Sequence, residues 1–339
     1  MYFKHEKIFA VESSCDESAL AFFDSQKGIL FEIIHSQIDL HSIYGGVVPD
    51  LASTEHLKKL PELCKQIPFD LNDANIIAVT SGPGLPNCLA MGMCTANAIS
   101  IWSGKSLRGV NHLRGHTFSP FINIHKNSPE NFAEELEKLL PHLGLVVSGG
   151  NTMLIEIDEN LKISLLSETV DDAAGEALDK GAKLLGIPYP GGPMLEKYAL
   201  EGDYKKFNFP KSDNEFFSFS GLKTSLRYFL DKLSPEEIKA EFPHICASYQ
   251  YAAIEQLKKK ALRFLKQKKY NSLGLSGGVA NNALLRQKFD NLSKTFGVKF
   301  LCADKEHRGD NASMIAFAAW IDSENCQNDN LKLSPNLGL

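Results

Sequence analysis

Paired cysteines are absent from this 339-residue sequence, although it contains seven cysteines. No two of them have the Cys-x-x-Cys spacing, and they are scattered at positions 15, 64, 88, 94, 246, 302 and 326. An odd, dispersed set indicates reduced thiols rather than a disulfide framework or a thiolate zinc site.

Long apolar runs and an excess of positive charge are also missing. The apolar segment from Cys88 to Trp102 is too short to span a bilayer, and it predicts a buried helix. The first residues contain no leader-like apolar region, so we expect a cytoplasmic protein that does not associate with membranes. The formal net charge is -5, so a nucleic-acid partner would have to meet a local basic patch or a partner protein.

Two common nucleotide-binding signatures, Gly-x-x-x-x-Gly-Lys-Ser/Thr and Gly-x-Gly-x-x-Gly before a helix, are lacking. Glycine-rich turns follow four predicted strands instead. Glycine lets backbone N–H groups approach phosphate oxygens, although any sharp turn favours glycine. Together the turns favour a nucleotide site divided between two lobes, and they lie at 81–84, 148–152, 189–193 and 276–279.

Short strands alternating with helices predict an α/β fold. Three strand-like runs at 7–13, 18–24 and 28–37 precede helices and further strands, and a similar order begins again at residue 144. This order predicts two ribonuclease-H-like lobes with a cleft between them. We expect the first lobe over 1–119, completed by a C-terminal helix at 310–339, and the second over 120–309.

His112 and His116 are four residues apart, so one helix face can present both imidazoles to a metal ion. The next residue, Leu113, stands where His-Glu-x-x-His proteases have their general base. On its own, a histidine pair at this spacing is more often incidental. Asp310 precedes the last predicted helix, where capping explains it, while a two-histidine, one-carboxylate site is the alternative.

Other acidic residues have two interpretations each. The Cys15–Glu17 turn of the first hairpin is either a phosphate-facing loop or an ordinary polar turn. The Asp171–Asp172 pair is predicted to cap the helix at 173–185. The spacing of Asp179 and Lys183 predicts an ion pair within that helix, with contact to ribose hydroxyls as the alternative.

Basic residues cluster in two places. A lysine-rich helix at 258–269 is predicted to be a solvated helix face, with phosphate contact as the alternative. A looser second cluster comprises Lys205, Lys206, Lys211, Lys223 and Arg227.

Motifs along nearly the whole chain resemble, in order, the bacterial TsaD family of tRNA threonylcarbamoyladenosine transferases, formerly labelled glycoproteases. The most specific are the histidine pair, the Phe217–Thr224 run and the Asp310-Asn311 dipeptide. The matching segments are 11–17, 44–49, 81–85, 112–116, 146–150, 171–180, 189–193, 217–224, 277–279 and 310–311.

The resemblance implies an actin-like, sugar-kinase-like (ASKHA) fold and an acyltransferase. Such enzymes transfer the threonylcarbamoyl group from threonylcarbamoyl-AMP to N6 of the adenosine 3′ of the anticodon, in tRNAs that read codons beginning with A, and release AMP. The implied partners are tRNA, a paralogous TsaB-type subunit and a TsaE-type ATPase. A metal-dependent glycoprotease, a non-catalytic scaffold and an ATPase of the same fold are the alternatives.

The resemblance also assigns site residues, and it reverses the spacing-based preference at Asp179 and Asp310. The implied metal ligands are His112, His116 and Asp310, holding one divalent ion per subunit, with iron expected first and zinc second. Asp16 and Glu17 are our candidates for a general base. The implied adenylate contacts are Val146, Val147, Ser148, Gly149, Gly150, Asp179, Gly192 and Asn282.

Two positions depart from the family pattern. Arg114 stands where members commonly have a glutamate, and Asn151 stands where they have a histidine. Arg114 predicts different tuning of the metal's surroundings or a different partner contact. Asn151 removes a titratable group and favours a protein shell of two histidines and one aspartate.

Overall fold

The computed structural model describes residues 3–212, 214–328 and 331–339. The chain forms two compact units: unit 1 comprises residues 1–139 and 302–339, and unit 2 comprises residues 140–301. Residues 120–139 and 302–309 thus belong with unit 1 and not with the second lobe, where we expected them from the sequence. An aromatic cluster explains part of this difference, because Phe132 packs against Phe317 and Trp320 with ring centroids 5.8 and 5.5 Å apart.

Unit 1 is built on a six-stranded mixed sheet, in the order β11-β5-β4-β1-β2-β3. Strand β1 pairs antiparallel with β2 and parallel with β4, so the first hairpin and the crossover strand share one core. The three strands expected between residues 7 and 37 are confirmed. The strands are β1 (Lys7–Glu12), β2 (Glu17–Asp24), β3 (Gly28–Ser36), β4 (Ile76–Gly82), β5 (Ser106–Asn111) and β11 (Gln327–Asn328).

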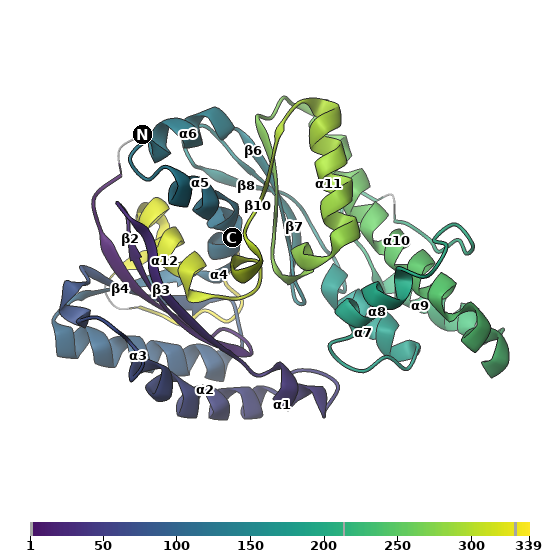
Figure 1. Ribbon diagram of the computed structural model, residues 1–339, viewed down its shortest axis with the longest axis horizontal. Coiled ribbons are helices and arrows are strands. Elements are labelled where there is room, and N and C mark those ends of the chain that lie inside the picture. The colour runs from purple at the N-terminus through teal and green to yellow at the C-terminus, as the bar shows by residue number, and fades with distance from the viewer. Residues whose placement is uncertain (1–2, 213, 329–330) are drawn as a thin grey trace. The chain divides into compact units, whose positions relative to one another are not determined.

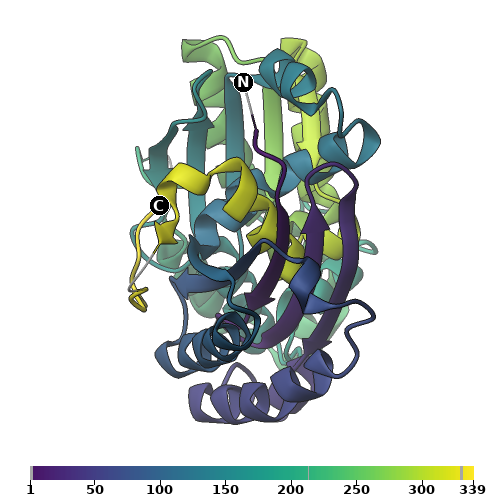
Figure 2. The same ribbon diagram turned by 90° about the vertical axis from the view of Figure 1, so that its left-hand side faces the viewer.

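Helices cover both faces of this sheet. Figures 1 and 2 show α2 and α3 on one face and α12 on the other. Every residue of α12 is buried, which its apolar sequence explains. The helices of unit 1 are α1 (Ile38–Ser42), α2 (Pro49–Cys64), α3 (Pro86–Ser103), α4 (His112–Phe118), α5 (Ile122–Asn127), α6 (Phe132–Leu139) and α12 (Ala312–Ile321).

Helix α3 contains the apolar segment that was predicted to form a buried helix. One side of the helix is buried, including Leu89 and Met93, whereas Ile101 and Trp102 near its end are exposed. No helix within the described ranges combines the length and apolar character needed to cross a membrane.

Unit 2 repeats the plan with a five-stranded sheet, in the order β10-β9-β6-β7-β8. Helices α10 and α11 pack against this sheet, and α7, α8 and α9 pack against α10. Helix α10 is 33 residues long and begins with a capping box formed by Ser234 and Glu237. The elements are β6 (His142–Val147), β7 (Thr152–Ile157), β8 (Ile163–Glu168), α7 (Ala174–Leu184), α8 (Gly191–Ala199), α9 (Ser220–Leu230), α10 (Pro235–Gln267), β9 (Ser272–Ser276), α11 (Ala283–Phe296) and β10 (Lys299–Cys302).

Candidate metal site and glycine-rich turns

The histidine pair lies on α4, which begins directly after β5. The side chain of Asn111 caps this helix by accepting hydrogen bonds from the backbone N–H groups of Leu113 (2.8 Å) and Arg114 (3.3 Å). The cap makes His112 the first helical residue and brings His116 onto the same face one turn later. Both imidazoles are buried, with ring centroids 4.8 Å apart.

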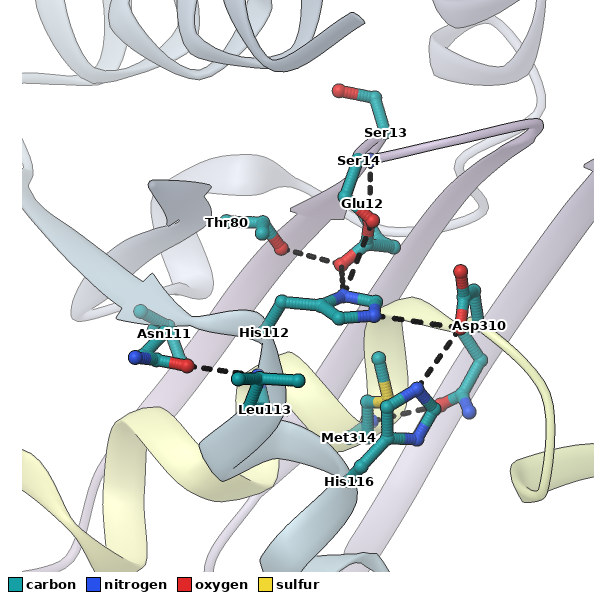
Figure 3. Close-up of polar contacts among 12 residues, drawn as sticks. Glu12, Ser13, Ser14, Thr80, Asn111, His112, Leu113, His116, Asp310 and Met314 are labelled. Atoms are coloured by element: carbon teal, nitrogen blue, oxygen red, sulfur yellow. Dashed lines mark hydrogen bonds and ion pairs between the residues drawn. The ribbon is translucent and has the colours of Figure 1, made fainter. Parts of the chain in front are cut away.

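Asp310 completes a cluster with the two histidines within unit 1 (Figure 3). Its Oδ1 lies 3.0 Å from Nε2 of His116 and 3.5 Å from Nε2 of His112. The potential ligand atoms of the three residues all lie within 4.8 Å of one another. Capping does not explain Asp310, because Asn311 is the residue that caps α12, by accepting from the N–H of Met314 at 2.8 Å. The capping interpretation of Asp310 was therefore wrong, and its carboxylate is left to face the histidines.

A buried carboxylate that the sequence analysis missed holds the first histidine. Glu12 Oε2 lies 3.2 Å from His112 Nδ1, the ring nitrogen opposite the one that faces Asp310. The hydroxyl of Thr80 and the backbone N–H of Ser14 both donate to the Glu12 carboxylate, which is fully buried. The available signal was a glutamate at the end of an otherwise apolar strand, because such a residue is rarely buried without a partner.

These charges shift one another's pKa. Burial would lower the pKa of His112, but Asp310 and Glu12 raise it to about 9. Burial would raise the pKa of Asp310, but His112 and His116 lower it to about 2. The pKa of Glu12 is lowered in the same way, because the interaction with His112 outweighs burial. The pocket thus has two carboxylates that favour a positive charge between them.

This donor set fits a divalent transition metal. Two imidazole nitrogens and one carboxylate oxygen suit iron or zinc, whereas magnesium and calcium prefer oxygen ligands alone. A carboxylate on the far nitrogen of a ligating histidine is the usual way to orient the ring and fix its tautomer. Glu12 and His112 have this arrangement, so the residues present fit the implied metal.

The turn after β1 lies close enough to Asp310 to interact with it electrostatically. Burial, Asp16 and Asp310 together raise the pKa of Glu17 well above its usual value. Burial, Asp16 and Asp310 also raise the pKa of the Cys15 thiol, so this residue does not offer a ready thiolate ligand. Glu17 accepts a hydrogen bond from the Ser36 hydroxyl at 3.2 Å.

Arg114 has a structural partner of its own. Its guanidinium binds the Asp322 carboxylate through two nitrogens, with Nη2 3.0 Å from Oδ1. Asp322 follows α12, so the pair joins α4 to the end of that helix within unit 1. Both side chains are largely buried, at 15% and 5% exposed. The departure at Arg114 is therefore explained by this ion pair, and no contact with the histidines or Asp310 is needed to account for it.

In unit 2, the turn after β6 is closed by backbone contacts. Val146 and Val147 are the buried last residues of β6. The N–H of Ser148 donates to the carbonyl of Asn151 at 2.8 Å, and the N–H of Asn151 donates to the Ser148 hydroxyl at 3.1 Å. A Cβ atom added at Gly149 or Gly150 would meet nothing within 4 Å, so both glycines border open space.

Two further glycines let neighbouring segments approach this turn closely. A Cβ at Gly175 would lie 2.4 Å from the carbonyl oxygen of Ser148. Gly277 has φ +86°, and a Cβ there would lie 2.3 Å from the carbonyl oxygen of Val147. The turns after β6 and β9 and the start of α7 are therefore packed together, while Gly149 and Gly150 remain open.

Asp179 on α7 supports the next helix rather than pairing with Lys183. Its Oδ1 accepts the N–H of Gly192 at 2.7 Å, at the start of α8. Burial raises the pKa of Asp179, although hydrogen bonds from Gly192 and Gly191 oppose the rise. No Asp179–Lys183 ion pair is found among the described residues, whereas the Glu176–Lys180 pair forms at 2.7 Å.

Asn282 caps α11, and the next residue, Ala283, donates its N–H to Glu196 of α8 at 2.6 Å. Oδ1 of Asn282 accepts the N–H of Leu285 at 3.0 Å, and its Nδ2 donates to Gln250 Oε1 at 3.1 Å. The cap and the Gln250 contact leave the second N–H of its amide for another acceptor.

The Asp171–Asp172 pair does not cap α7, so that prediction was wrong. Asp171 binds the segment before α9 instead: it accepts from the Ser218 hydroxyl at 2.6 Å and the Ser220 hydroxyl at 2.7 Å. Asp172 pairs with Lys180 at 2.9 Å and Lys223 at 3.3 Å. Two motifs far apart in the sequence are thus joined.

Solved structures with the same architecture confirm the expected fold class. The HypF protein of T. kodakarensis matches 93% of this chain with a TM-score of 0.58 at 15% identity, over 47% of its own length. The component A of the (R)-2-hydroxyglutaryl-CoA dehydratase from Acidaminococcus fermentans matches 94% with a TM-score of 0.53 at 12% identity, over 98% of its own length. At such low identity these likenesses show the actin-like, ASKHA-type α/β fold alone.

Sequence relatives identify the family. Residues 28–317 match the TsaD family, described as tRNA N6-adenosine threonylcarbamoyltransferase. A protein of that name from Thermosipho melanesiensis is 41% identical over 98% of this chain and 99% of its own length. One from Clostridium perfringens is 38% identical over 98% of both chains. The chain therefore belongs to the TsaD family of tRNA N6-adenosine threonylcarbamoyltransferases.

Proposed function

We propose that this chain transfers a threonylcarbamoyl group from threonylcarbamoyl-AMP to the N6 amine of the adenosine 3′ of the anticodon, in tRNAs reading codons that begin with A. The main support is full-length family membership in a chain that retains the buried His112, His116 and Asp310 cluster. A glycoprotease is not favoured, because Leu113 stands where the protease helix has its base.

The reaction is an acyl transfer to an amine. The N6 nitrogen attacks the carbamoyl carbon, a C–N bond forms, and the C–O bond to the AMP phosphate breaks. The proton lost from N6 passes to a base, and AMP leaves with the bonding electron pair. Since the acyl group arrives activated, the protein has mainly to position the reactants and stabilise negative charge on oxygen.

Residues of unit 2 are proposed to bind the adenylate. The open turn at Gly149 and Gly150 offers backbone N–H donors that suit phosphate oxygens. The Asp179 carboxylate is fixed through Oδ1 by the N–H of Gly192, and its remaining acceptor capacity suits ribose hydroxyls. The remaining amide N–H of Asn282 supplies a further donor. Val146, Val147 and Ser148 shape the turn.

Residues of unit 1 are proposed to hold one divalent ion. His112, His116 and Asp310 would be its ligands, with Glu12 orienting the first ring. The bound ion, iron in our first expectation and zinc in our second, supplies Lewis acidity for charge that develops on oxygen.

Glu17 is our preferred proton acceptor, with Asp16 beside it. Burial and the neighbouring Asp16 and Asp310 raise the pKa of Glu17, which makes it a stronger base than an ordinary exposed glutamate. We propose a cytoplasmic enzyme that works with a TsaB-type paralogue and a TsaE-type ATPase, because the net charge of -5 leaves part of the tRNA contact to partners.

Reconstitution tests the proposal. The metal-loaded protein, with its partner proteins, is given threonylcarbamoyl-AMP and unmodified tRNA, and digested nucleosides are analysed by mass spectrometry. We expect threonylcarbamoyladenosine with wild type and almost none with His116→Ala. His35→Ala, at a half-buried histidine paired with Glu55, is the matched control and should retain activity. Absence of product under conditions where the Thermosipho relative is active would refute the proposal.

A further inference from the structure

Residues 202–209, between α8 and α9, are fixed to neighbouring helices although they have no regular structure. A Cβ at Gly202 would lie 2.0 Å from the carbonyl oxygen of Pro243, so this stretch lies directly on α10. The N–H of Asp203 donates to Nδ1 of His244 at 2.8 Å. Phe209 is buried and contacts Phe229, with ring centroids 5.4 Å apart. The segment is therefore held in one place.

This anchored segment presents an aromatic pair at the surface. The ring of Tyr204 stacks on that of Tyr251 from α10, with centroids 4.2 Å apart and an interplanar angle of 20°. Tyr204 is 41% exposed. Phe207 and Phe209 anchor the segment through their contacts with Phe229, so the exposed tyrosine is not needed for that purpose.

Lysines surround the tyrosine pair. The ammonium group of Lys205 lies 5.8 Å from the Tyr204 ring centroid, and that of Lys211 lies 5.7 Å from the Tyr251 centroid. A third, Lys288 from α11, lies 4.4 Å from the Tyr251 centroid. We call Tyr204, Tyr251, Lys205, Lys211 and Lys288 the tyrosine–lysine platform.

Among the described residues, two lysines of the platform are not neutralised by a neighbouring carboxylate. Lys288 is paired with Glu255 at 2.9 Å, and nearby Lys206 is paired with Glu241. Within the part of the chain that the structure describes, Lys205 and Lys211 form no ion pair. The nearby Asp203 carboxylate accepts the backbone N–H of Lys205 at 2.9 Å.

The platform also adjoins the proposed adenylate contacts within unit 2. Tyr251 follows Gln250 in α10, and Gln250 accepts the hydrogen bond from Asn282. Lys288 lies on α11, the helix that Asn282 caps. A macromolecule bound at the platform would therefore lie near the residues proposed to hold the activated group.

We propose that the tyrosine–lysine platform binds an unpaired stretch of RNA, with a base stacked on Tyr204 and the flanking phosphates contacted by Lys205 and Lys211. Aromatic rings flanked by unpaired lysines are the usual means of binding single-stranded RNA, since every base has a face to stack and every nucleotide a phosphate. Because the chain's net charge is -5, any RNA contact that the chain makes itself needs a local basic patch such as this one. This inference rests on the proposed function, which makes tRNA the RNA in question.

Binding of unmodified tRNA to the metal-loaded protein, measured by fluorescence anisotropy, tests the stacking contact. Tyr204→Ala is expected to raise Kd by about tenfold, the usual cost of losing one base–aromatic stack. Tyr204→Phe, which keeps the ring, should stay within about twofold of wild type. Tyr228→Ala removes another exposed tyrosine with an arginine over its ring, and should have no effect. Unchanged binding by Tyr204→Ala would overturn the stacking role.

The lysine contacts predict a change in salt dependence. The double variant Lys205→Gln/Lys211→Gln removes two exposed or half-exposed charges, so folding should be preserved. The slope of log Kd against log salt should become shallower by roughly 1.4, at about 0.7 per phosphate contact on a single strand. Lys294→Gln, at an exposed lysine paired with Asp290, should leave the slope unchanged. An unchanged slope in the double variant would overturn the phosphate contacts.

The same variants separate this inference from the proposed function. If wild type forms threonylcarbamoyladenosine and Tyr204→Ala has unchanged Kd and KM for tRNA, the platform is refuted and the function stands. If wild type binds tRNA through the platform but yields no product under the reconstitution conditions, the function is refuted and the platform stands.

Discussion

Two buried histidines, one in each unit, show opposite behaviour. His112 in unit 1 lies between Glu12 and Asp310, which raise its pKa to about 9. His142 in unit 2 contacts the Ser272 hydroxyl at 2.7 Å, and burial lowers its pKa to about 3. Burial opposes charge in both, so the neighbouring carboxylates decide the outcome. His112 thus lies in a site that favours a positive charge, whereas His142 is a neutral part of the core.

The candidate sites of the two units also differ in how far they depend on charged side chains. The proposed metal site is built from ionisable side chains, and one of them, His112, is held by the buried Glu12. The proposed adenylate site consists largely of backbone N–H groups beside glycines, with Asp179 itself held by the N–H of Gly192. Side-chain substitutions should therefore impair function more strongly in the candidate site of unit 1 than in that of unit 2.

The largest effect is expected at Asp310. Asp310→Ala removes the carboxylate that faces both imidazoles, and both metal content and transfer rate should fall, the rate by about a thousandfold. Metal analysis by mass spectrometry and the nucleoside assay measure the two losses. Asp304→Ala, at an exposed aspartate of the same unit, is the control. Full metal occupancy in Asp310→Ala would rule out its role as a ligand.

A large loss of stability without loss of metal is expected at Arg114. Arg114→Leu leaves Asp322 buried without its ion-pair partner, which should cost about 3 kcal/mol of unfolding free energy. Arg114→Leu combined with Asp322→Leu should recover most of that loss, because no charge is left unpaired. Urea unfolding measures stability, and metal titration should give nearly unchanged affinity. A drop in metal affinity that the double variant does not repair would place Arg114 among the groups that tune the metal.

Glu12 should matter through His112 rather than by direct contact with substrate. Glu12→Gln keeps the size of the side chain but removes the negative charge that faces His112 Nδ1. Metal affinity should therefore fall by about 10- to 100-fold. Thr80→Val removes only a donor to that carboxylate and should have a smaller effect. Equal affinities in Glu12→Gln and wild type would contradict the orienting role.

We expect His142 and His112 to change the unfolding free energy in opposite ways as pH changes. Since the folded-state pKa of His142 lies below its ordinary value of 6.5, only the unfolded chain is protonated as pH falls, and the unfolding free energy should drop by about 1.4 kcal/mol per pH unit between 6.5 and 3. His112 in metal-free protein behaves conversely: its contribution is complete below pH 6.5 and is lost as pH rises through 9. Urea unfolding across pH tests both. In the double variant His142→Leu/Ser272→Ala, the slope of unfolding free energy against pH below 6.5 should decrease by the contribution of one proton. An unchanged slope would contradict the lowered pKa of His142.

The smallest effect is expected in the backbone turns. Gly149→Ala adds a methyl group in open space, so stability should be unchanged while the Kd for AMP rises by a few-fold, roughly 1 kcal/mol or less. Gly277→Ala should instead lower the melting temperature, because φ is +86° and Val147 is too close. Calorimetry of unfolding and of AMP binding separates the two effects. Equal destabilisation by both variants would show that Gly149 is structural.

The elements of the fold could be predicted because each carries a local pattern. The first hairpin and helix α12 follow directly from their apolar runs, although the C-terminal helix expected over 310–339 ends at Ile321. The unit boundary could not be predicted from the sequence. Residues 120–139 join unit 1 through contacts between residues far apart in the sequence, such as that of Phe132 with Trp320.

The histidine pair of the candidate site could be predicted from the sequence, but the contacts that support it could not. His112 and His116 follow from helical spacing, whereas the position of Asp310 beside them depends on the fold, and spacing alone favoured a cap. Neither the contact of Glu12 with His112 nor that of Arg114 with Asp322 has a local signature, since each joins residues about 100 or more positions apart.

We propose that the His112, His116 and Asp310 cluster serves tRNA modification, and nucleoside analysis of cellular tRNA tests this role most directly. Cells whose only copy of the gene carries Asp310→Ala are compared with cells carrying wild type, with protein levels matched by immunoblot. We expect threonylcarbamoyladenosine to disappear from the tRNA of the variant cells. Unchanged threonylcarbamoyladenosine in those cells would contradict this role.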